Sequence, residues 1–325
     1  MTQIKNIGLF TSGGDSPGMN AAIRAVVRAA IYYNIGVTGI GRGFEGMING
    51  EMFPMDRKSV SNIIQRGGTI LKTARSEQFK TAEGRKKAYE QLKKNNIDAL
   101  IAIGGDGTFR AAKIFGEEYD IPMMGMPGTI DNDLCGTDFT IGYDTAINTV
   151  INAVDKIRDT AESHNRLFIV EVMGKDSGLI ALRTGIGAGA EAILIPESKT
   201  DLQSVFDRLA NSRKDKTSKI IMLAEHGESG DAFEVGRQIK ERFPHYDTRI
   251  SVLGHIQRGG KPTCMDRVLA SRVGVAAVEG LMAGRRDEMV GLIHNEIAYT
   301  PFENATKHIE APNPDFLKIV EMLSI

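Results

Sequence analysis

Two carboxylates stand two residues apart in the stretch Pro127–Asp133, which reads Pro-Gly-Thr-Ile-Asp-Asn-Asp. The apolar run 121–126 before it predicts a strand, and Pro127 and Gly128 predict the end of that strand. Asp131 and Asp133 are then expected on a loop beyond the carboxyl edge, where open α/β sheets bind ligands. Such a pair can hold a metal, or divide metal binding and base catalysis between its members. The alternative is a polar turn that caps the next helix.

Two glycine-rich turns have the composition of phosphate-binding loops. The segment 11–20, Thr-Ser-Gly-Gly-Asp-Ser-Pro-Gly-Met-Asn, lies between an apolar strand and a helix with alanines at helical spacing. Free N–H groups at such a helix start attract phosphate. The segment matches neither a Walker loop nor Gly-x-Gly-x-x-Gly. The second turn, Gly104-Gly105-Asp106-Gly107-Thr108, also enters a helix; its alternative interpretation is a tight turn with a helix-capping Asp.

Two further polar segments carry cationic side chains. Lys72, Thr73 and Arg75 follow Gly67-Gly68-Thr69, and the segment 255–260 reads His-Ile-Gln-Arg-Gly-Gly. Taken singly, Arg75 is more often a surface arginine than a functional one, and a lone histidine is more often structural. Their coincidence with the glycine turns at expected strand ends favours function.

Strands and helices are expected to alternate along the chain, which predicts an α/β fold with parallel-type sheets flanked by helices. The expected strands are 7–10, 37–41, 99–103, 121–126, 167–172, 192–195, 220–224, 249–254 and 289–294. The expected helices are 21–30, 57–66, 83–95, 142–161, 177–188, 201–212, 231–243, 265–283 and a short one after Pro314.

Composition is that of a globular protein large enough for two domains. Among 325 residues, 42% are hydrophobic and 25% charged, and 40 basic against 41 acidic side chains give a net charge of −1. Bulk charge therefore gives no reason to expect nucleic-acid or membrane-surface binding. Only Cys135 and Cys264 occur, which favours reduced thiols and a cytoplasmic location. No signal-peptide pattern is expected at the N-terminus, and no apolar run approaches the ~20 residues of a membrane helix.

Five motifs together resemble the bacterial ATP-dependent 6-phosphofructokinases. They are Thr-Ser-Gly-Gly-Asp-x-Pro-Gly-Met-Asn, Gly-Gly-Asp-Gly, Pro-Gly-Thr-Ile-Asp-Asn-Asp, Glu-Val-Met-Gly and Gly-His-Ile-Gln-Arg-Gly-Gly. The resemblance extends from about Ile7 to about Gly284. It implies transfer of the γ-phosphoryl group of MgATP to the 1-hydroxyl of fructose 6-phosphate, a step of glycolysis.

The resemblance assigns roles residue by residue. Asp131 is implied as the general base, with Thr129 and Arg75 also catalytic. The implied ATP-binding residues are Gly14, Arg75, Ser76, Gly105, Asp106, Gly107 and Thr108. Asp106 is implied as the Mg²⁺ ligand, with Asp133 assisting. The implied sugar-phosphate residues are Thr129, Ile130, Asp131, Arg166, Met173, Gly174, Lys175, Glu225, Arg249, His255, Ile256, Gln257 and Arg258.

An oligomer with shared sites is also implied, since Arg166 and Arg249 resemble the pair that this family supplies from a neighbouring subunit, usually within a homotetramer. An effector site for ADP or phosphoenolpyruvate is implied at Arg24, Arg28, Arg57, Arg158, Gly189, Glu191, Lys214 and Lys216. Three positions depart from the family pattern. Lys175 replaces a common Arg, Lys58 replaces an aromatic that stacks on adenine, and Ser218 replaces a basic imidazole.

The resemblance further implies a phosphofructokinase-like division into domains with the site in the cleft between them. A nucleotide-binding domain is expected over 1–141 and 256–304, and a sugar-phosphate domain over 142–255, rejoined by 305–325.

Two other functions compete with this prediction. Pyrophosphate-dependent members of the family have motifs that resemble Gly-Gly-Asp-Asp and Pro-Lys-Thr-Ile-Asp-Asn-Asp at the two decisive turns. This chain has Gly107 in place of the second Asp of the first motif and Gly128 in place of the Lys of the second, so both residues favour ATP as the donor. A Gly-Gly-Asp-Gly-Thr turn also resembles NAD and lipid kinases, but those lack the 255–260 segment. A non-catalytic nucleotide sensor is a different class, and it would need no base such as Asp131.

Overall fold

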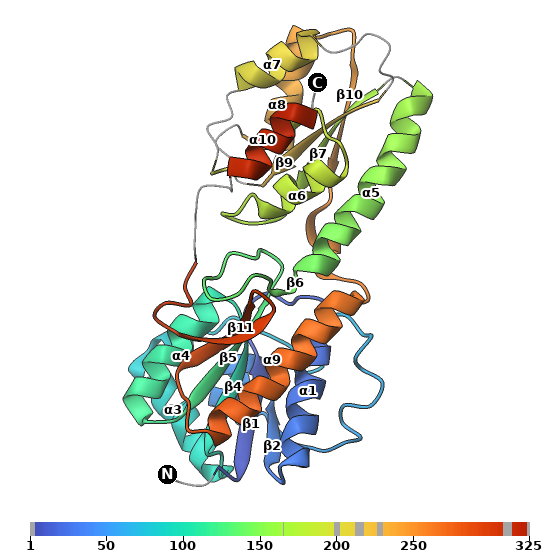
Figure 1. Cartoon of the computed structure of the whole chain (residues 1–325). Coiled ribbons are helices and arrows are strands. Elements are labelled where there is room, and N and C mark those ends of the chain that lie inside the picture. The colour runs from blue at the N-terminus through green and yellow to red at the C-terminus, as the bar shows by residue number, and fades with distance from the viewer. Residues whose placement is uncertain are drawn as a thin grey trace. The chain divides into compact units, whose positions relative to one another are not determined.

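The computed structural model describes residues 4–164, 166–197, 202–211, 218–225, 230–307 and 314–323. The chain divides into two compact units (Figure 1). Unit 1 comprises residues 1–130, 134–145 and 258–308, and unit 2 comprises 131–133, 146–257 and 309–325.

Unit 1 is built on an eight-stranded sheet in the order β12-β11-β5-β4-β1-β2-β3, with β6 paired to β5. Its strands are β1 (Asn6–Thr11), β2 (Gly36–Ile40), β3 (Met52–Met55), β4 (Ala99–Gly104), β5 (Met123–Thr129), β6 (Ile141–Gly142), β11 (Glu288–Ile293) and β12 (Glu296–Pro301). The inner strands pair in parallel, while β3 and β12 run antiparallel at the two edges. The chain direction across the sheet reverses between β1 and β4, so this is the switch point of a doubly wound sheet.

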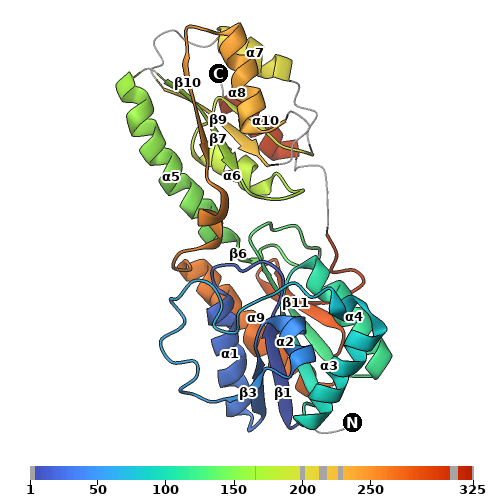
Figure 2. The ribbon, with the colours of Figure 1, turned by 180° about the vertical axis from the view of Figure 1, so that it is seen from behind.

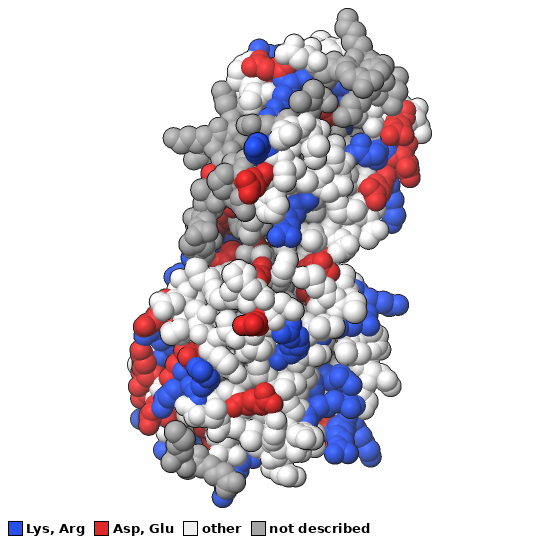
Figure 3. Space-filling view, in the orientation of Figure 1, with Lys and Arg blue, Asp and Glu red and all other residues white. Residues whose placement is uncertain are grey.

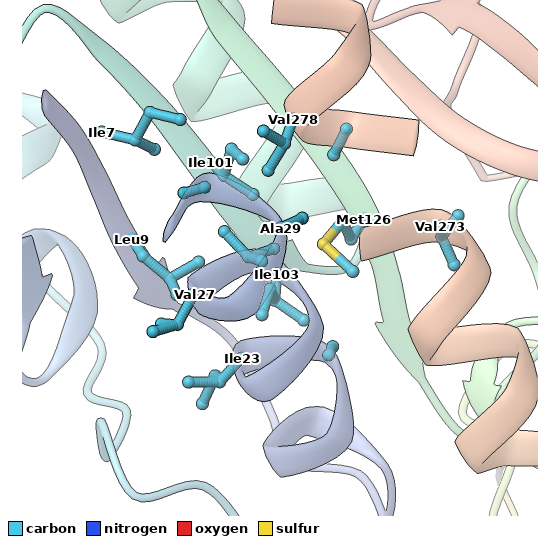
Figure 4. Packing of buried hydrophobic residues seen from close by; sticks show 14 of the residues in the cluster. Ile7, Leu9, Ile23, Val27, Ala29, Ile101, Ile103, Met126, Val273 and Val278 are labelled. Carbon is cyan, nitrogen blue, oxygen red and sulfur yellow. The ribbon is translucent and has the colours of Figure 1, made fainter. Parts of the chain in front are cut away.

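Helices cover both faces of this sheet (Figures 1 and 2). They are α1 (Met19–Tyr32), α2 (Gly43–Asn49), α3 (Ala82–Lys94), α4 (Asp106–Tyr119) and α9 (Cys264–Met282), with a 3₁₀ turn, η1, at Gln78–Lys80. On one face, α1 and α9 pack against β1, β4 and β5, and Figure 4 shows Ile23 and Val27 beside Leu9 and Ile103. The opposite face buries an aromatic cluster of α2, η1 and α4, in which Phe44 stacks on Phe79 at 4.1 Å between ring centroids.

Unit 2 has a four-stranded, wholly parallel sheet in the order β10-β7-β9-β8. Its strands are β7 (Arg166–Val172), β8 (Ala192–Leu194), β9 (Lys219–Ala224) and β10 (Asp247–Val252). Its helices are α5 (Tyr143–His164), α6 (Leu179–Gly187), α7 (Leu202–Asn211), α8 (Ala232–Arg242) and α10 (Pro314–Leu323), with a 3₁₀ turn, η2, at Gly254–Arg258. One face of the sheet packs its apolar side chains on α7 and α8. The C-terminal α10 lies against α6, where the Arg183 guanidinium sits over the Phe316 ring.

The predicted fold class is confirmed, since two mostly parallel sheets are flanked by helices. The expected helix over 57–66 is wrong, because this segment forms successive turns. The Asp56 carboxylate accepts the N–H groups of Lys58 and Ser59, and Asn62 has a left-handed φ of 56°. Both features favour a turn over a continuing helix.

The expected end of the strand at Pro127 is also wrong, because β5 continues to Thr129. On one side of β5, pairing with β11 stops at Gly125 and pairing with β6 begins at Gly128. Pro127 falls in this gap, so its missing N–H interrupts no ladder there. Asp131 and Asp133 nevertheless follow the carboxyl end of the strand, as expected.

Candidate functional site

The two glycine turns meet at the switch point between β1 and β4. A Cβ placed on Gly104 would lie 2.6 Å from the Ser12 carbonyl oxygen and 2.4 Å from Thr108 Oγ1. Only glycine therefore permits this close approach. Gly13, with a φ of 82°, also faces Thr108, at 3.7 Å from its would-be Cβ to Oγ1. The structure thus brings the predicted phosphate loops together at the edge where doubly wound sheets bind ligands.

The Gly105–Thr108 turn presents the positive end of a helix. Gly105 is the N-cap of α4, and Asp106 is its first residue. A carboxylate is favourable at this position, and Asp106 Oδ1 accepts bonds from Arg110 Nε at 2.9 Å and Lys307 N at 3.3 Å. Gly107 is exposed, and a Cβ there would meet nothing within 4 Å. No packing constraint within the described protein requires glycine at this residue.

The end of β5 lies beside the same turn. A Cβ on Gly105 would lie 3.8 Å from Thr129 Cβ, and the Thr129 carbonyl accepts a 2.7 Å bond from Thr140 Oγ1. Ile130 is fully buried, and Asp131 and Asp133 are only 8% and 6% exposed. Carboxylates buried to this degree are costly unless they serve a purpose or are compensated.

The segment carrying Arg75 is fastened to the β1–α1 turn. Thr73 Oγ1 donates to the Gly13 carbonyl at 2.6 Å, and Thr11 Oγ1 donates to the Lys72 carbonyl at 2.8 Å. Arg75 is exposed, and Ser76 Oγ accepts the Phe79 N–H at 3.2 Å. The backbone contacts hold the segment of Arg75 next to Gly13 and Gly14.

Arg258 also reaches the β1–α1 turn. Its Nη1 donates to the Asp15 carbonyl at 3.2 Å and would lie 2.4 Å from a Cβ on Gly14. The absence of a side chain at Gly14 is what admits the guanidinium. His255 and Ile256, on the same 3₁₀ turn, are exposed.

A second group of predicted residues assembles in unit 2 at the carboxyl ends of β7, β9 and β10. Glu225 Oε1 accepts the N–H of Lys175 at 2.9 Å and that of Gly174 at 3.3 Å. Buried Gln257 accepts the Met173 N–H at 3.3 Å. Lys175 has a left-handed φ of 58° and is exposed. These bonds fix the backbone of the 173–175 turn and leave the Lys175 side chain at the surface.

Arg166 and Arg249 lie elsewhere in the same sheet. Arg166 opens β7 while Met173 follows it, so the two are on the order of 20 Å apart along the strand. Arg166 Nε donates to Asp247 at 2.7 Å, and Arg249 Nη2 donates to the same carboxylate at 3.1 Å. The Arg166 hydrogen bond lowers the pKa of Asp247. Sequence reasoning missed Asp247, although its spacing of two from Arg249 places both on one strand face.

The predicted effector residues are distributed over both units. On α1, Arg24 and Arg28 share a face, and the pKa of Arg24 is lowered by burial and then by the charge of Arg28. The remaining described positions in this set are exposed Arg57 and Gly189, part-buried Arg158, which donates to the Ala188 carbonyl, and buried Glu191. Lys214 and Lys216 lie outside the described residues. Lys58 is exposed, whereas Ser218 is buried with Oγ 3.5 Å from Glu162 Oε1.

The predicted magnesium ligands have suitable chemistry. Mg²⁺ prefers hard oxygen ligands and is usually held by one or two carboxylates together with substrate phosphates and water. Asp106 and Asp133 each offer a carboxylate, and the Asp106 side chain is 13% exposed. Within the described ranges, no group of three or more His, Cys, Asp or Glu side chains is arranged to hold a metal. The donor set fits a metal that arrives with its substrate.

An open, mostly parallel sheet with glycine turns at its switch point, followed by buried carboxylates after β5, is typical of phosphate-binding α/β proteins. The phosphofructokinase family model matches residues 6–281. This chain belongs to the phosphofructokinase family, and the resemblance read from its motifs is confirmed.

The relatives are similar over the full length. An ATP-dependent 6-phosphofructokinase 2 of Bacteroides thetaiotaomicron is 53% identical, with 100% of each chain covered. An ATP-dependent 6-phosphofructokinase of Cytophaga hutchinsonii is 54% identical, with 99% of this chain and 98% of the relative covered.

Solved structures agree in fold. The phosphofructokinase of Saccharomyces cerevisiae has a TM-score of 0.89 at 33% identity, with 98% of this chain covered, and this chain spans 50% of that longer one. A pyrophosphate-dependent phosphofructokinase of Marinobacter aquaeolei, at 22% identity and a TM-score of 0.84 over 98% of this chain and 91% of that one, shares the fold.

Proposed function

We propose that this chain phosphorylates fructose 6-phosphate at its 1-hydroxyl with ATP, giving fructose 1,6-bisphosphate and ADP in glycolysis. The observation that carries the proposal is the meeting of the Gly13 and Thr108 turns beside the end of β5, in a chain of the phosphofructokinase family. Phosphoryl transfer requires charge neutralisation and in-line positioning more than covalent chemistry. Glycine turns, a helix start and nearby cationic side chains meet those needs.

On the donor side, the backbone at Gly14 and the turn Gly105–Thr108 bind the ATP phosphates. The exposed guanidinium of Arg75 adds positive charge, and Ser76 adds a hydroxyl. The open space before Gly107 supports ATP as the donor, because an Asp or Asn side chain there would occupy it. Gly128 carries less weight for donor choice. A Cβ there would lie 2.9 Å from Ile103 Cγ2 and 3.0 Å from Met19 Cε, so packing alone requires glycine.

On the acceptor side, Asp131 removes the proton from the sugar 1-hydroxyl as the oxygen attacks phosphorus, and Thr129 stands two residues before it in sequence. Asp106 and Asp133 would hold a Mg²⁺ ion that arrives with ATP, and such an ion would neutralise charge that develops on the phosphate oxygens. The burial of Asp131 keeps its carboxylate at a fixed position in poor contact with bulk water.

The sugar phosphate is bound by His255 and Arg258, and the turn of Met173, Gly174 and Lys175 with Glu225 contacts the sugar. Lys175 supplies a point charge where an arginine would supply a planar fork, so its contact is less directional. Arg166 and Arg249 serve the site of a second protomer in a homotetramer. Their position at the other end of the β7–β10 pair from Met173 supports that assignment.

We assign the paired arginines of α1 with Arg57 in unit 1, and Arg158, Gly189 and Glu191 in unit 2, to the binding of an anionic effector such as ADP or phosphoenolpyruvate. The exposed Lys58 offers no ring to stack on an adenine, which favours the smaller acid. We place the protein in the cytoplasm. In the part of the chain that the structure describes, no helix is both long and apolar enough to cross a membrane.

The test is an assay of fructose 1,6-bisphosphate formation by the purified protein with fructose 6-phosphate and Mg²⁺, offering ATP or pyrophosphate. We expect turnover with ATP only. Turnover with pyrophosphate would contradict the argument from Gly107. Nucleotide binding without turnover on either donor would instead support a sensor.

A further inference from the structure

Asn20 ends the first glycine-rich motif, and the proposed mechanism gives it no task. It lies in the first turn of α1 and is 1% exposed. Its amide nitrogen donates to the carbonyls of Arg66 and Gly67, each at 3.1 Å, and its Oδ1 accepts the Ile70 N–H at 2.8 Å. One buried side chain therefore satisfies three backbone groups of a single turn.

That turn begins the segment that ends at Arg75. Two further hydrogen bonds hold the segment. Thr69 Oγ1 lies 3.0 Å from Thr11 Oγ1, and the Leu71 carbonyl accepts the Arg42 N–H at 2.8 Å. The Lys72 carbonyl also accepts a bond from Thr11 Oγ1, and Thr73 Oγ1 donates to the Gly13 carbonyl, so the segment is held from residue 66 to residue 73. Arg75 lies two residues beyond the last bond.

The turn has no freedom to move toward the 258–260 segment. A Cβ on Gly67 would lie 2.3 Å from the Gly260 carbonyl oxygen, so the two backbones are already in contact. Loss of the Asn20 amide would leave two carbonyls and one N–H without these hydrogen bonds. Each group would have to find another partner, because a buried polar group without one destabilises the fold. The turn would then shift, carrying with it the segment fastened to the donor-phosphate loop.

We propose that Asn20 is a positioning residue for phosphoryl transfer: its amide fixes the 66–70 turn and thereby places Arg75 against the donor phosphates. The inference rests on the proposed donor role of Arg75. It predicts that Asn20 acts on the ATP side of the reaction, although it touches neither substrate. A role in stability alone would affect both substrates equally.

The chain contains a matched control. Asn6, at the start of β1, also donates its amide to two carbonyls of one turn, those of Asn95 and Asn96, each at 3.2 Å. That turn lies at the amino end of the sheet, since it precedes β4. Asn6→Ala therefore removes a comparable set of bonds from the end of the sheet that carries no predicted site residue.

The experiment compares wild type, Asn20→Ala, Asn20→Asp and Asn6→Ala in steady-state kinetics and in hydrogen–deuterium exchange. Asn20→Asp keeps the acceptor for the Ile70 N–H but loses both donors. We expect kcat/KM for MgATP to fall about 10- to 100-fold in both Asn20 variants, with KM for fructose 6-phosphate within about twofold of wild type. Amides of 66–73 should exchange faster in these variants only, and those of 95–98 only in Asn6→Ala.

The decisive comparison is with Arg75. If Asn20 acts through Arg75, Asn20→Ala/Arg75→Ala should lose no more MgATP efficiency than Arg75→Ala alone. Multiplying effects, a rise of KM for fructose 6-phosphate well beyond twofold, or a similar MgATP defect in Asn6→Ala would overturn the proposal. A wild-type protein inactive with ATP would overturn the proposed function. Unchanged exchange over 66–73 would by itself refute the positioning role of Asn20, whatever the activity.

Discussion

At the scale of single residues, the buried carboxylates after β5 are the side chains whose proposed chemical role can be tested most directly. Asp131→Asn preserves size and burial but removes the proposed proton acceptor. We expect kcat to fall about 10²- to 10⁴-fold, with little change in the KM for ATP. Asp98→Asn is the control, because Asp98 accepts the N–H groups of Lys5 and Asn6 at the amino end of the sheet. Near-normal turnover in Asp131→Asn would show that another group takes the proton.

The choice of phosphoryl donor can be examined at Gly107 and Gly128. The two differ in their surroundings, since Gly107 faces open space and Gly128 is closely packed. Gly107→Asp meets no protein atom at its Cβ, so we expect wild-type thermal stability with a KM for ATP raised at least about tenfold. Gly128→Ala should instead lower stability by roughly 1–3 kcal/mol through overpacking against Ile103 and Met19. Thermal unfolding and ATP titration of the two variants measure both effects. Equal stability losses would contradict this separation.

At the scale of elements, a buried carboxyl joins the starts of two helices. Asp266, in the first turn of α9, accepts the N–H groups of Gly142 and Thr145 at 2.8 Å and so caps α5. Thr263, the N-cap of α9, donates from Oγ1 to Asp144 at 2.6 Å and from its N–H to Thr145 Oγ1 at 3.0 Å. Each helix thus stabilises the start of the other.

Burial raises the pKa of Asp266 to about 6, although its hydrogen bonds oppose the rise. Its ordinary value is 3.8, so between about pH 4 and 6 the folded chain keeps a proton that the unfolded chain has lost. Stability from this group is therefore full at low pH and falls as pH rises, by up to about 3 kcal/mol for about two pKa units.

The measurement is the difference in unfolding free energy between wild type and Asp266→Asn from pH 4 to pH 7. We expect this difference to shift in favour of wild type as pH is lowered. Asp56→Asn is the control, because hydrogen bonds from Ser59 lower the pKa of Asp56 from its ordinary value of 3.8. Stabilisation from Asp56 is lost only as pH falls below about 4, so its difference from wild type should stay nearly constant from pH 4 to pH 7. A pH-independent difference for Asp266→Asn would refute the assignment.

Most elements could be predicted from the sequence because their patterns are long and regular. The apolar face of α5 and the continuous apolar runs of β4 and β9 are examples. The misses have local causes. The strand β3 is only four residues long and includes Pro54, and β12 is a partly exposed edge strand. The turns over 57–66 depend on side-chain caps that an apolar pattern does not reveal.

The candidate site was predictable in part, since the type and spacing of residues on glycine turns can be recognised in the sequence. Asn20 does not, because its backbone partners are adjacent only after folding. The spacing of Asp247 from Arg249 was a signal, but its second partner, Arg166, is adjacent only in the folded sheet. Resemblance identified the family, but the packing around Gly128 and the open space at Gly107 required coordinates.

At the scale of the whole molecule, basic and acidic side chains are interspersed over both units on the face in Figure 3, in keeping with a net charge of −1. The division of labour that we propose among protomers depends instead on two arginines. Arg166 and Arg249 share the Asp247 carboxylate at the amino end of their strands.

Shared sites predict complementation between inactive variants. Asp131→Asn lacks the base, and Arg166→Ala lacks a cation that serves a neighbour, so each homo-oligomer should be nearly inactive. Oligomers that mix the two variants would contain some sites with both residues intact. We expect activity to reappear after the two proteins are unfolded and refolded together, measured against each refolded alone. No recovery, with mixed oligomers shown by mass spectrometry, would contradict shared sites.

The helix caps around Asp266 have a consequence for how such a chain could arise. The chain leaves unit 1 after Thr145 and returns at Arg258, and near these exits Thr145 and Thr263 are hydrogen-bonded to each other. The 112 residues 146–257, which are the largest of the three segments of unit 2, thus have neighbouring points of departure and return. A host whose two cut ends already meet accepts an inserted domain with little added loop-closure entropy. Unit 1 can therefore be regarded as a host interrupted by most of unit 2, and a short peptide bridge between the caps, in a chain without residues 309–325, would restore an uninterrupted host.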